Sequence, residues 1–159
     1  MNKTWIVFLL CLFVSGAFAQ DLFKERIRKI DGKKRGIYLD QGVFSFGNSS
    51  AEATALTKIR HSYRKGEGFE RIVFDFTSSQ PAKLYSYMDK NAKKLYLDFF
   101  QTQISGDVGS FGTSPFVQSI DIFPVDENQV SLELNFKTDV NVEVFYLTDP
   151  GRLVIDVKK

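Results

Sequence analysis

The chain has few of the side chains on which most metal, redox and nucleophilic sites depend. It contains one cysteine and one histidine, Cys11 and His61. A disulfide needs two cysteines, and a zinc site draws on several cysteine or histidine ligands, so we expect no disulfide, no metal and no cofactor. No serine motif accompanies His61, which we expect to have a structural or surface role. The net charge of only +2 predicts no strong attraction to nucleic acid.

Long apolar runs are also scarce, and the run at the N-terminus is too short to cross a membrane. Lys3 precedes the apolar stretch 5–14, which Ser15 and Gly16 interrupt before Ala17-Phe18-Ala19. This order is typical of a cleavable secretory signal peptide, whereas a membrane span needs about 20 apolar residues. Cys11 lies inside the run and follows a leucine, which argues against a lipoprotein. We therefore expect cleavage after Ala19, export to the periplasm and no transmembrane span in the mature chain.

The segment that follows, residues 20–35, is rich in positive charge. Its basic part, Lys24 to Arg35, contains many more lysine and arginine residues than acids. Leu22, Phe23, Ile27 and Ile30 recur at a spacing that is compatible with a short helix. The segment is either a solvated arm or a docking segment for an anionic partner. We assign residues 20–54 to this basic arm and to short strands that follow it.

From Gly36 onward the pattern changes to short strands separated by polar turns. Apolar and polar residues alternate with a period of two, most clearly at Ile72, Phe74 and Phe76. The sixteen phenylalanines predict a large aromatic core. The stretch Ala51–Ile59 could begin as a short helix and end as a strand, which the pattern leaves undecided, and Gly106–Ser114 is expected to be an exposed loop. Strands are expected at residues 37–39, 43–46, 71–76, 82–88, 94–100, 117–123, 129–136, 140–147 and 152–157.

The strands fall into two similar copies, at about residues 55–100 and 116–159. A gap-free alignment that places Ile72 on Val130 also places residues 94–98 on residues 152–156. Each copy alone would leave an apolar face in water, and packing the two faces together removes it. The predicted fold is therefore all-β, a duplicated two-sheet β-sandwich at residues 55–159. A ligand-carrying β-barrel is less favoured, because the large inward aromatics predict a filled core.

Segments of both copies resemble the AMIN domain family. The residues that carry the resemblance are Arg71-Ile-Val-Phe-Asp-Phe-Thr and, above all, Asp149-Pro-Gly-Arg-Leu-Val-Ile-Asp156. The family's pattern is a strand like R-V-V-L-D-L, then a D/N-P-x-R turn followed by L-V-I-D-L. The resemblance covers roughly residues 55–159 and agrees with two similar sheets packed face to face. In the first copy Asn91-Ala-Lys-Lys94 replaces the Asp-Pro-Gly-Arg turn.

The resemblance implies a non-catalytic module of the bacterial periplasm. AMIN domains accompany cell-wall amidases and secretins and are thought to bind peptidoglycan or to place a partner in the envelope. We expect a free-standing module that binds peptidoglycan or localises a cell-wall or secretion machine. The alternative is a protein–protein adaptor that acts through the basic arm without binding glycan. Roles in cell division and in secretion or motility both remain compatible with the sequence.

The carboxylates of the strands do not predict an enzyme. Hydrolysis of a glycosidic bond needs two carboxylates about 5–10 Å apart. Leu95, Leu97 and Phe99 are expected to face the core, so Asp98 points outward, and the repeat places Asp156 on the opposite outer face. We expect both carboxylates to be solvated, paired at most with Lys94 or Arg152 nearby. A hydrolase is therefore disfavoured.

The expected binding residues are aromatic and basic side chains on the strands. Aromatic rings stack on sugars, and arginine side chains bind carboxylates. The same residue types are also common on exposed strands that bind nothing, so both interpretations stand. The candidate peptidoglycan- or partner-binding residues are Tyr63, Arg64, Arg71, Tyr85, Lys94, Tyr96 and Arg152.

Overall fold

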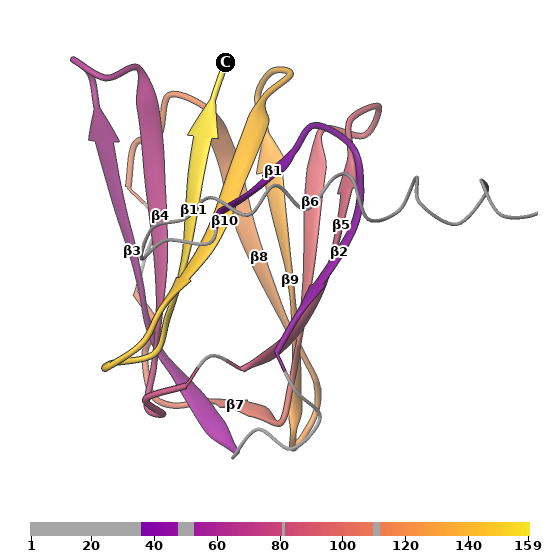
Figure 1. The fold of residues 1–159 in the computed structure, drawn as a ribbon, viewed down its shortest axis with the longest axis vertical. Coiled ribbons are helices and arrows are strands. Elements are labelled where there is room, and N and C mark those ends of the chain that lie inside the picture. The colour runs from indigo at the N-terminus through magenta and orange to yellow at the C-terminus, as the bar shows by residue number, and fades with distance from the viewer. Residues whose placement is uncertain (1–35, 48–52, 81, 110–111) are drawn as a thin grey trace, which may run out of the picture. The chain divides into compact units, whose positions relative to one another are not determined.

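A computed structural model describes residues 36–47, 53–80, 82–109 and 112–159, which form strands and connections without a helix. The ribbon in Figure 1 shows two layers of strands that face each other. The predicted signal peptide and the basic arm with its helical spacing lie outside the described residues. In these ranges no helix is long and apolar enough to span a bilayer.

The strands form one sheet of six strands and one of five, called sheet A and sheet B here. Sheet A has the order β1-β10-β11-β4-β3-β7, and sheet B has the order β2-β5-β6-β9-β8. The protein is thus all-β, with two sheets arranged as in a β-sandwich. The strands are β1 Gly36–Leu39, β2 Gly42–Phe46, β3 Thr54–Arg64, β4 Phe69–Phe76, β5 Lys83–Asp89, β6 Lys94–Phe100, β7 Thr102–Ile104, β8 Val117–Asp126, β9 Gln129–Phe136, β10 Asn141–Leu147 and β11 Arg152–Lys158.

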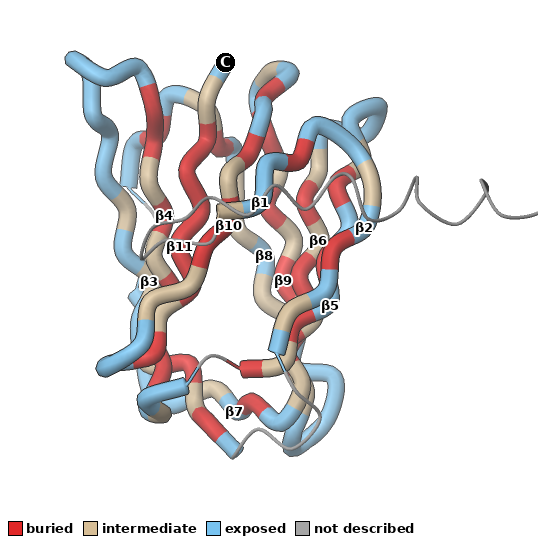
Figure 2. The backbone as a smooth tube through the Cα atoms, viewed as in Figure 1, coloured by how far each residue is buried: buried red, intermediate tan, exposed pale blue. Residues whose placement is uncertain are grey.

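The core lies between the two sheets and is built from alternate residues of their strands. Along β6, Leu95, Leu97 and Phe99 are fully buried while the residues between them are partly exposed, as predicted. Figure 2 shows this alternation of buried and exposed positions along the strands. It follows from strand geometry, since successive side chains point to opposite faces.

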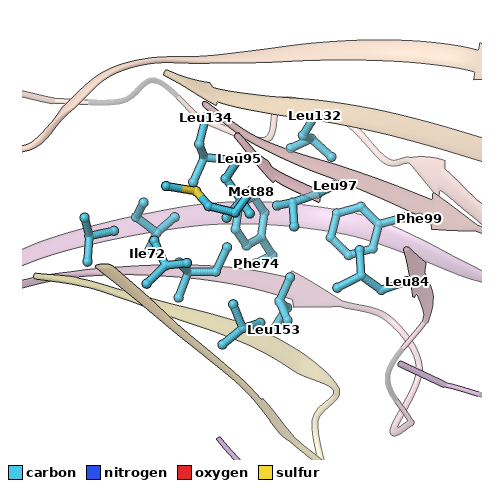
Figure 3. Packing of buried hydrophobic residues seen from close by; sticks show 14 of the residues in the cluster. Ile72, Phe74, Leu84, Met88, Leu95, Leu97, Phe99, Leu132, Leu134 and Leu153 are labelled. Atoms are coloured by element: carbon cyan, nitrogen blue, oxygen red, sulfur yellow. The ribbon is translucent and has the colours of Figure 1, made fainter. Parts of the chain in front are cut away.

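Aromatic rings from the two sheets meet at the centre of the core. The ring centroid of Phe99 in sheet B lies 6.1 Å from that of Phe74 and 5.3 Å from that of Phe76, both in sheet A. Aliphatic side chains of both sheets surround these rings (Figure 3). Each fully buried side chain of this size stabilises the fold by about 1.5–3 kcal/mol.

Strands β1 and β2 extend the two sheets at one side of the molecule. β1 pairs with β10 in sheet A, and β2 pairs with β5 in sheet B. The ring of Phe46 in β2 stacks on that of Tyr146 in β10, with centroids 4.3 Å apart. Burial raises the pKa of Tyr146 above its ordinary value. These strands, which the sequence assigned to the region before the sandwich, therefore contribute to its core.

The region that the sequence left undecided belongs to a long strand. Of Ala51–Ile59, the residues from Thr54 onward lie in β3, which continues to Arg64. A short strand absent from the prediction, β7, runs parallel to β3, with Thr102 opposite Thr54. Three residues carry too little alternation to be recognised as a strand. Its backbone partners are distant in sequence: β7 pairs with β3, and the Thr102 amide donates a hydrogen bond of 2.9 Å to the Asn128 carbonyl.

The strand pairings correct the predicted alignment of the two copies. Lys94 lies opposite Asn135 in sheet B, and Arg152 lies opposite Asp75 in sheet A. Since Lys94 and Arg152 are equivalent in the predicted repeat, Asp75 corresponds to Asn135, whereas the gap-free alignment places Asp75 on Glu133. The gap-free alignment is therefore wrong between β4 and β9.

The physical reason for this error is the period of a strand. A shift of two residues leaves every apolar side chain on the same face, so alternation alone cannot detect it. The difference lies in the connections: β4 joins β5 through residues 77–82, whereas β9 joins β10 through the shorter stretch 137–140.

Gly151, in the turn before β11, packs against the connection from β4 to β5. Its amide donates a hydrogen bond to the Ser78 carbonyl at 2.9 Å, and a β-carbon at this position would lie 2.5 Å from the same oxygen. We therefore expect Gly151→Ala to lower the free energy of unfolding by about 1–3 kcal/mol in urea denaturation, the range for overpacked sites. Gly66→Ala is the control, because a β-carbon there has no atom within 4 Å, and it should change stability little. Equal stabilities of the two variants would contradict this packing.

Candidate functional site: the outer face of sheet B

Three of the candidate residues lie together on the outer face of sheet B. Tyr85 is on β5, and Lys94 and Tyr96 are on the neighbouring β6. Their positions alternate with the buried Leu84 and Leu95, which directs all three side chains away from the core. The structure thus collects on one surface residues that the sequence placed on separate strands.

Tyr87 completes this group, although it is not among the binding residues expected from the sequence. It lies directly opposite Tyr96, and the two rings are nearly parallel, with centroids 6.1 Å apart. Tyr85 is 42% exposed and Tyr87 is 37% exposed. The alternation that directs Tyr85 outward also directs Tyr87 outward, so this signal was available. We call Tyr85, Tyr87 and Tyr96 the tyrosine face.

Charged side chains flank the tyrosine face. The Lys94 ammonium group lies 2.8 Å from a Glu133 carboxylate oxygen and 6.0 Å from the centre of the Tyr96 ring. The hydrogen bond to Glu133 raises the pKa of Lys94 above its ordinary value. Asp98 accepts a hydrogen bond of 2.5 Å from the Ser131 hydroxyl, and Asp121 accepts one of 2.7 Å from the Asn135 amide.

The other four candidate residues belong to sheet A and do not join this group. Tyr63 is exposed on β3 and meets the Phe116 ring edge-on, with centroids 6.0 Å apart. Arg64 ends β3, and its Nη1 lies 3.5 Å from Oε1 of Glu67, which is in the turn before β4. Arg152 begins β11, and its Nε donates to the Pro150 carbonyl at 3.4 Å.

Arg71 is the fourth, and its guanidinium group is already occupied within the protein. Its Nε and Nη2 each donate a hydrogen bond of 2.6 Å to the carboxylate of Asp156. These bonds raise the pKa of Arg71, so the group stays charged. The guanidinium carbon also lies 5.2 Å from the centre of the Phe69 ring and 5.4 Å from that of Phe145. Arg71 therefore stabilises sheet A.

The expectation that Asp98 and Asp156 are both solvated is wrong for Asp156. The side chain of Asp156 is only 6% exposed and binds Arg71, while Asp98 is partly exposed and binds Ser131. The two carboxylates lie in different sheets, as expected. The partners were missed because they come from strands whose pairing the sequence does not specify.

His61 contacts a buried carboxylate that the sequence pattern did not single out. Its Nε2 pairs with Oε1 of Glu70, whose side chain is fully buried. The other oxygen of Glu70 accepts a hydrogen bond of 3.0 Å from the Phe116 amide. Glu70 therefore connects β3, β4 and the segment that leads into β8.

Among the described residues, no three histidine, cysteine, aspartate or glutamate side chains lie together so that they could hold a metal ion. In the expected loop Gly106–Ser114, residues 106–109 and 112–114 belong to no strand. Residues 110 and 111 lie outside the described residues. In comparisons with known proteins, no protein family and no curated protein matches the chain.

Proposed function

We propose that this protein is a non-catalytic periplasmic module, similar to AMIN domains, that binds peptidoglycan through the tyrosine face. The observation that carries the proposal is that the exposed Tyr85 and Tyr87 lie side by side with the partly exposed Tyr96 on adjoining strands. Flat aromatic surfaces stack on the apolar faces of sugar rings, and nearby carboxylates and lysine bind hydroxyl, amide and carboxyl groups. The signal-peptide pattern of residues 1–19 supports export to the periplasm.

The order of the strands supports the duplicated sandwich that the resemblance to AMIN domains implies. Sheet A contains the run β10-β11-β4-β3, and sheet B contains the corresponding run β5-β6-β9-β8. Each run joins one hairpin of the first copy to one hairpin of the second. If each strand of β10-β11-β4-β3 is replaced by its equivalent in the other copy, the result is β5-β6-β9-β8.

The proposal is tested by co-sedimentation of the purified protein with intact peptidoglycan sacculi. We expect saturable binding that Tyr85→Ala and Tyr96→Ala each weaken by about tenfold, since a lost aromatic contact costs up to about 1.5 kcal/mol. Tyr38→Ala is the control, because Tyr38 is exposed on the edge of sheet A.

Three outcomes of this experiment separate the possibilities. Binding that Tyr38→Ala weakens as much as Tyr96→Ala would place the glycan elsewhere on the surface. If the sedimentation is repeated at several salt concentrations and the protein binds the sacculi at none of them, the proposal is contradicted. That result would favour the adaptor that acts through residues 24–35. Release of soluble wall fragments would indicate a hydrolase.

A further inference from the structure

The two sheets contain the same carboxylate position with different partners. In the predicted repeat, Asp98 of β6 corresponds to Asp156 of β11. Asp156 lies opposite Arg71 on β4, and Asp98 lies opposite Ser131 on β9. Arg71 and Ser131 are therefore equivalent to each other in the corrected alignment of β4 with β9. One sheet supplies a guanidinium group to its carboxylate, and the other supplies a neutral hydroxyl group.

In sheet A, the carboxylate at this position binds a guanidinium group. The Arg71 guanidinium forms two hydrogen bonds of 2.6 Å with Asp156, and its carbon lies 5.2 Å and 5.4 Å from two aromatic ring centres. Carboxylates and aromatic faces both attract cations, and the two effects combine when the cation touches both. The outer surface at this position is thus suited to an organic cation.

Sheet B also places aromatic rings beside its carboxylate, but from other positions: Phe145 of sheet A corresponds to Tyr87, and Glu143, opposite Asp156, corresponds to Tyr85, opposite Asp98. Tyr85 is the cross-strand neighbour of Asp98, and Tyr96 lies two residues before it on the same face of β6. Within the described residues, the hydrogen bond to Asp98 comes from Ser131, a neutral donor. The nearest lysine on this strand, Lys94, is paired with Glu133. Among the residues that the structure describes, no ion pair therefore neutralises the negative charge of Asp98.

The surrounding surface strengthens the attraction for a cation. The register and the alternation of β5, β6 and β9, and of β8 as far as Phe123, direct four carboxylates and two lysines outward from sheet B. These residues are Asp89, Asp98, Asp121 and Glu133, together with Lys83 and Lys94. A net negative face favours a positively charged ligand.

We propose that Asp98, Tyr85 and Tyr96 form a binding site for a primary amine, in the place that the Arg71 guanidinium occupies in sheet A. The inference rests on the proposed wall binding and names the group recognised: the free amine on the peptide part of peptidoglycan. The amine donates hydrogen bonds to the Asp98 carboxylate and packs on the tyrosine rings. The tyrosines alone would not distinguish this group from a neutral sugar.

The test compares untreated sacculi with sacculi whose amines have been acetylated, which removes the positive charge and leaves the glycan intact. We expect acetylation to weaken binding about tenfold, and Asp98→Asn to weaken binding to untreated sacculi by the same factor. Acetylation should then have no further effect on the Asp98→Asn protein. Asp121→Asn is the control, because it removes the same charge from the same face, at a position farther from Tyr85.

A second variant tests the comparison between the sheets directly. Ser131→Arg places a guanidinium group opposite Asp98, as Arg71 is placed opposite Asp156, and it should abolish the dependence on amines while the protein remains folded. Urea denaturation reports folding independently of binding. A folded Ser131→Arg protein that still prefers untreated sacculi would overturn the inference.

The remaining outcomes distinguish this inference from the proposed function. If acetylated and untreated sacculi bind equally while Tyr96→Ala loses binding, wall binding stands and the amine site is overturned. If no sacculi bind, both are overturned. Capture on polylysine beads through Asp98, with no effect of acetylation on sacculi, would assign the site to a basic protein and overturn the wall amine.

Discussion

Replacing Glu70 with alanine is expected to lower the free energy of unfolding by about 2–5 kcal/mol, because buried polar groups lose a partner at about 1–3 kcal/mol each and a cavity is left behind. The Glu70 side chain is fully buried, and its two oxygens contact the His61 ring and the Phe116 amide. Removing it leaves both groups without this partner and opens a cavity between the sheets. A whole domain is stable by only about 5–15 kcal/mol, so the loss should be plain in urea denaturation.

The matched control for this experiment is Glu67→Ala in the adjacent turn. The Glu67 side chain is 60% exposed and lies 3.5 Å from Arg64. An exposed ion pair contributes at most about 1 kcal/mol, so this variant should remain close to the wild type. Similar stabilities of the two variants would show that Glu70 does not anchor the segment before β8.

The second large effect concerns the Arg71–Asp156 pair in sheet A. We expect Arg71→Ala to cost about 3–5 kcal/mol, because it leaves the buried Asp156 carboxylate uncompensated. Asp156→Ala should cost less, about 2–3 kcal/mol, because the Arg71 side chain is 26% exposed and its charge keeps contact with water. The double variant should be more stable than the sum of the two losses predicts, which a double-mutant cycle measures.

Arg60 and Asp75 provide an internal control for that cycle. They form the same two hydrogen bonds, each 2.6 Å long, on the same side of sheet A. Their side chains are 47% and 21% exposed, against 26% and 6% for Arg71 and Asp156. Since geometry is matched and burial differs, we expect a coupling energy below about 1 kcal/mol for this pair. Equal coupling in both cycles would contradict the role assigned to burial.

Much of the fold could be predicted from local alternation. The apolar positions of β4, β6 and β9 follow a period of two, and the buried side chains of Phe74 and Leu97 are among those expected. The same rule directs Tyr85 and Tyr96 outward, since they alternate with the buried Leu84 and Leu95. It failed for β7, which is too short to show a period, and for the alignment of β4 with β9, because a two-residue shift preserves the period.

The candidate site could be predicted only in part. Residue type and alternation indicated that tyrosines lie on the surface, but not that Tyr87 stacks on Tyr96. Arg71 had the right chemistry for a ligand, yet its guanidinium group binds a carboxylate 85 residues away in the chain. Glu70 is charged and was not expected in the core, because its partners come from other segments.

The amino-acid sequence by itself determined where most of the strands lie and which face of each of them enters the core. Both follow from the alternation of side chains along one extended segment, which needs no knowledge of its neighbours. The tertiary structure alone decided which strands lie side by side, and therefore that Asp156 meets Arg71 while Asp98 meets Ser131. Strand pairing depends on burying both sheets at once, and this is a property of the whole chain.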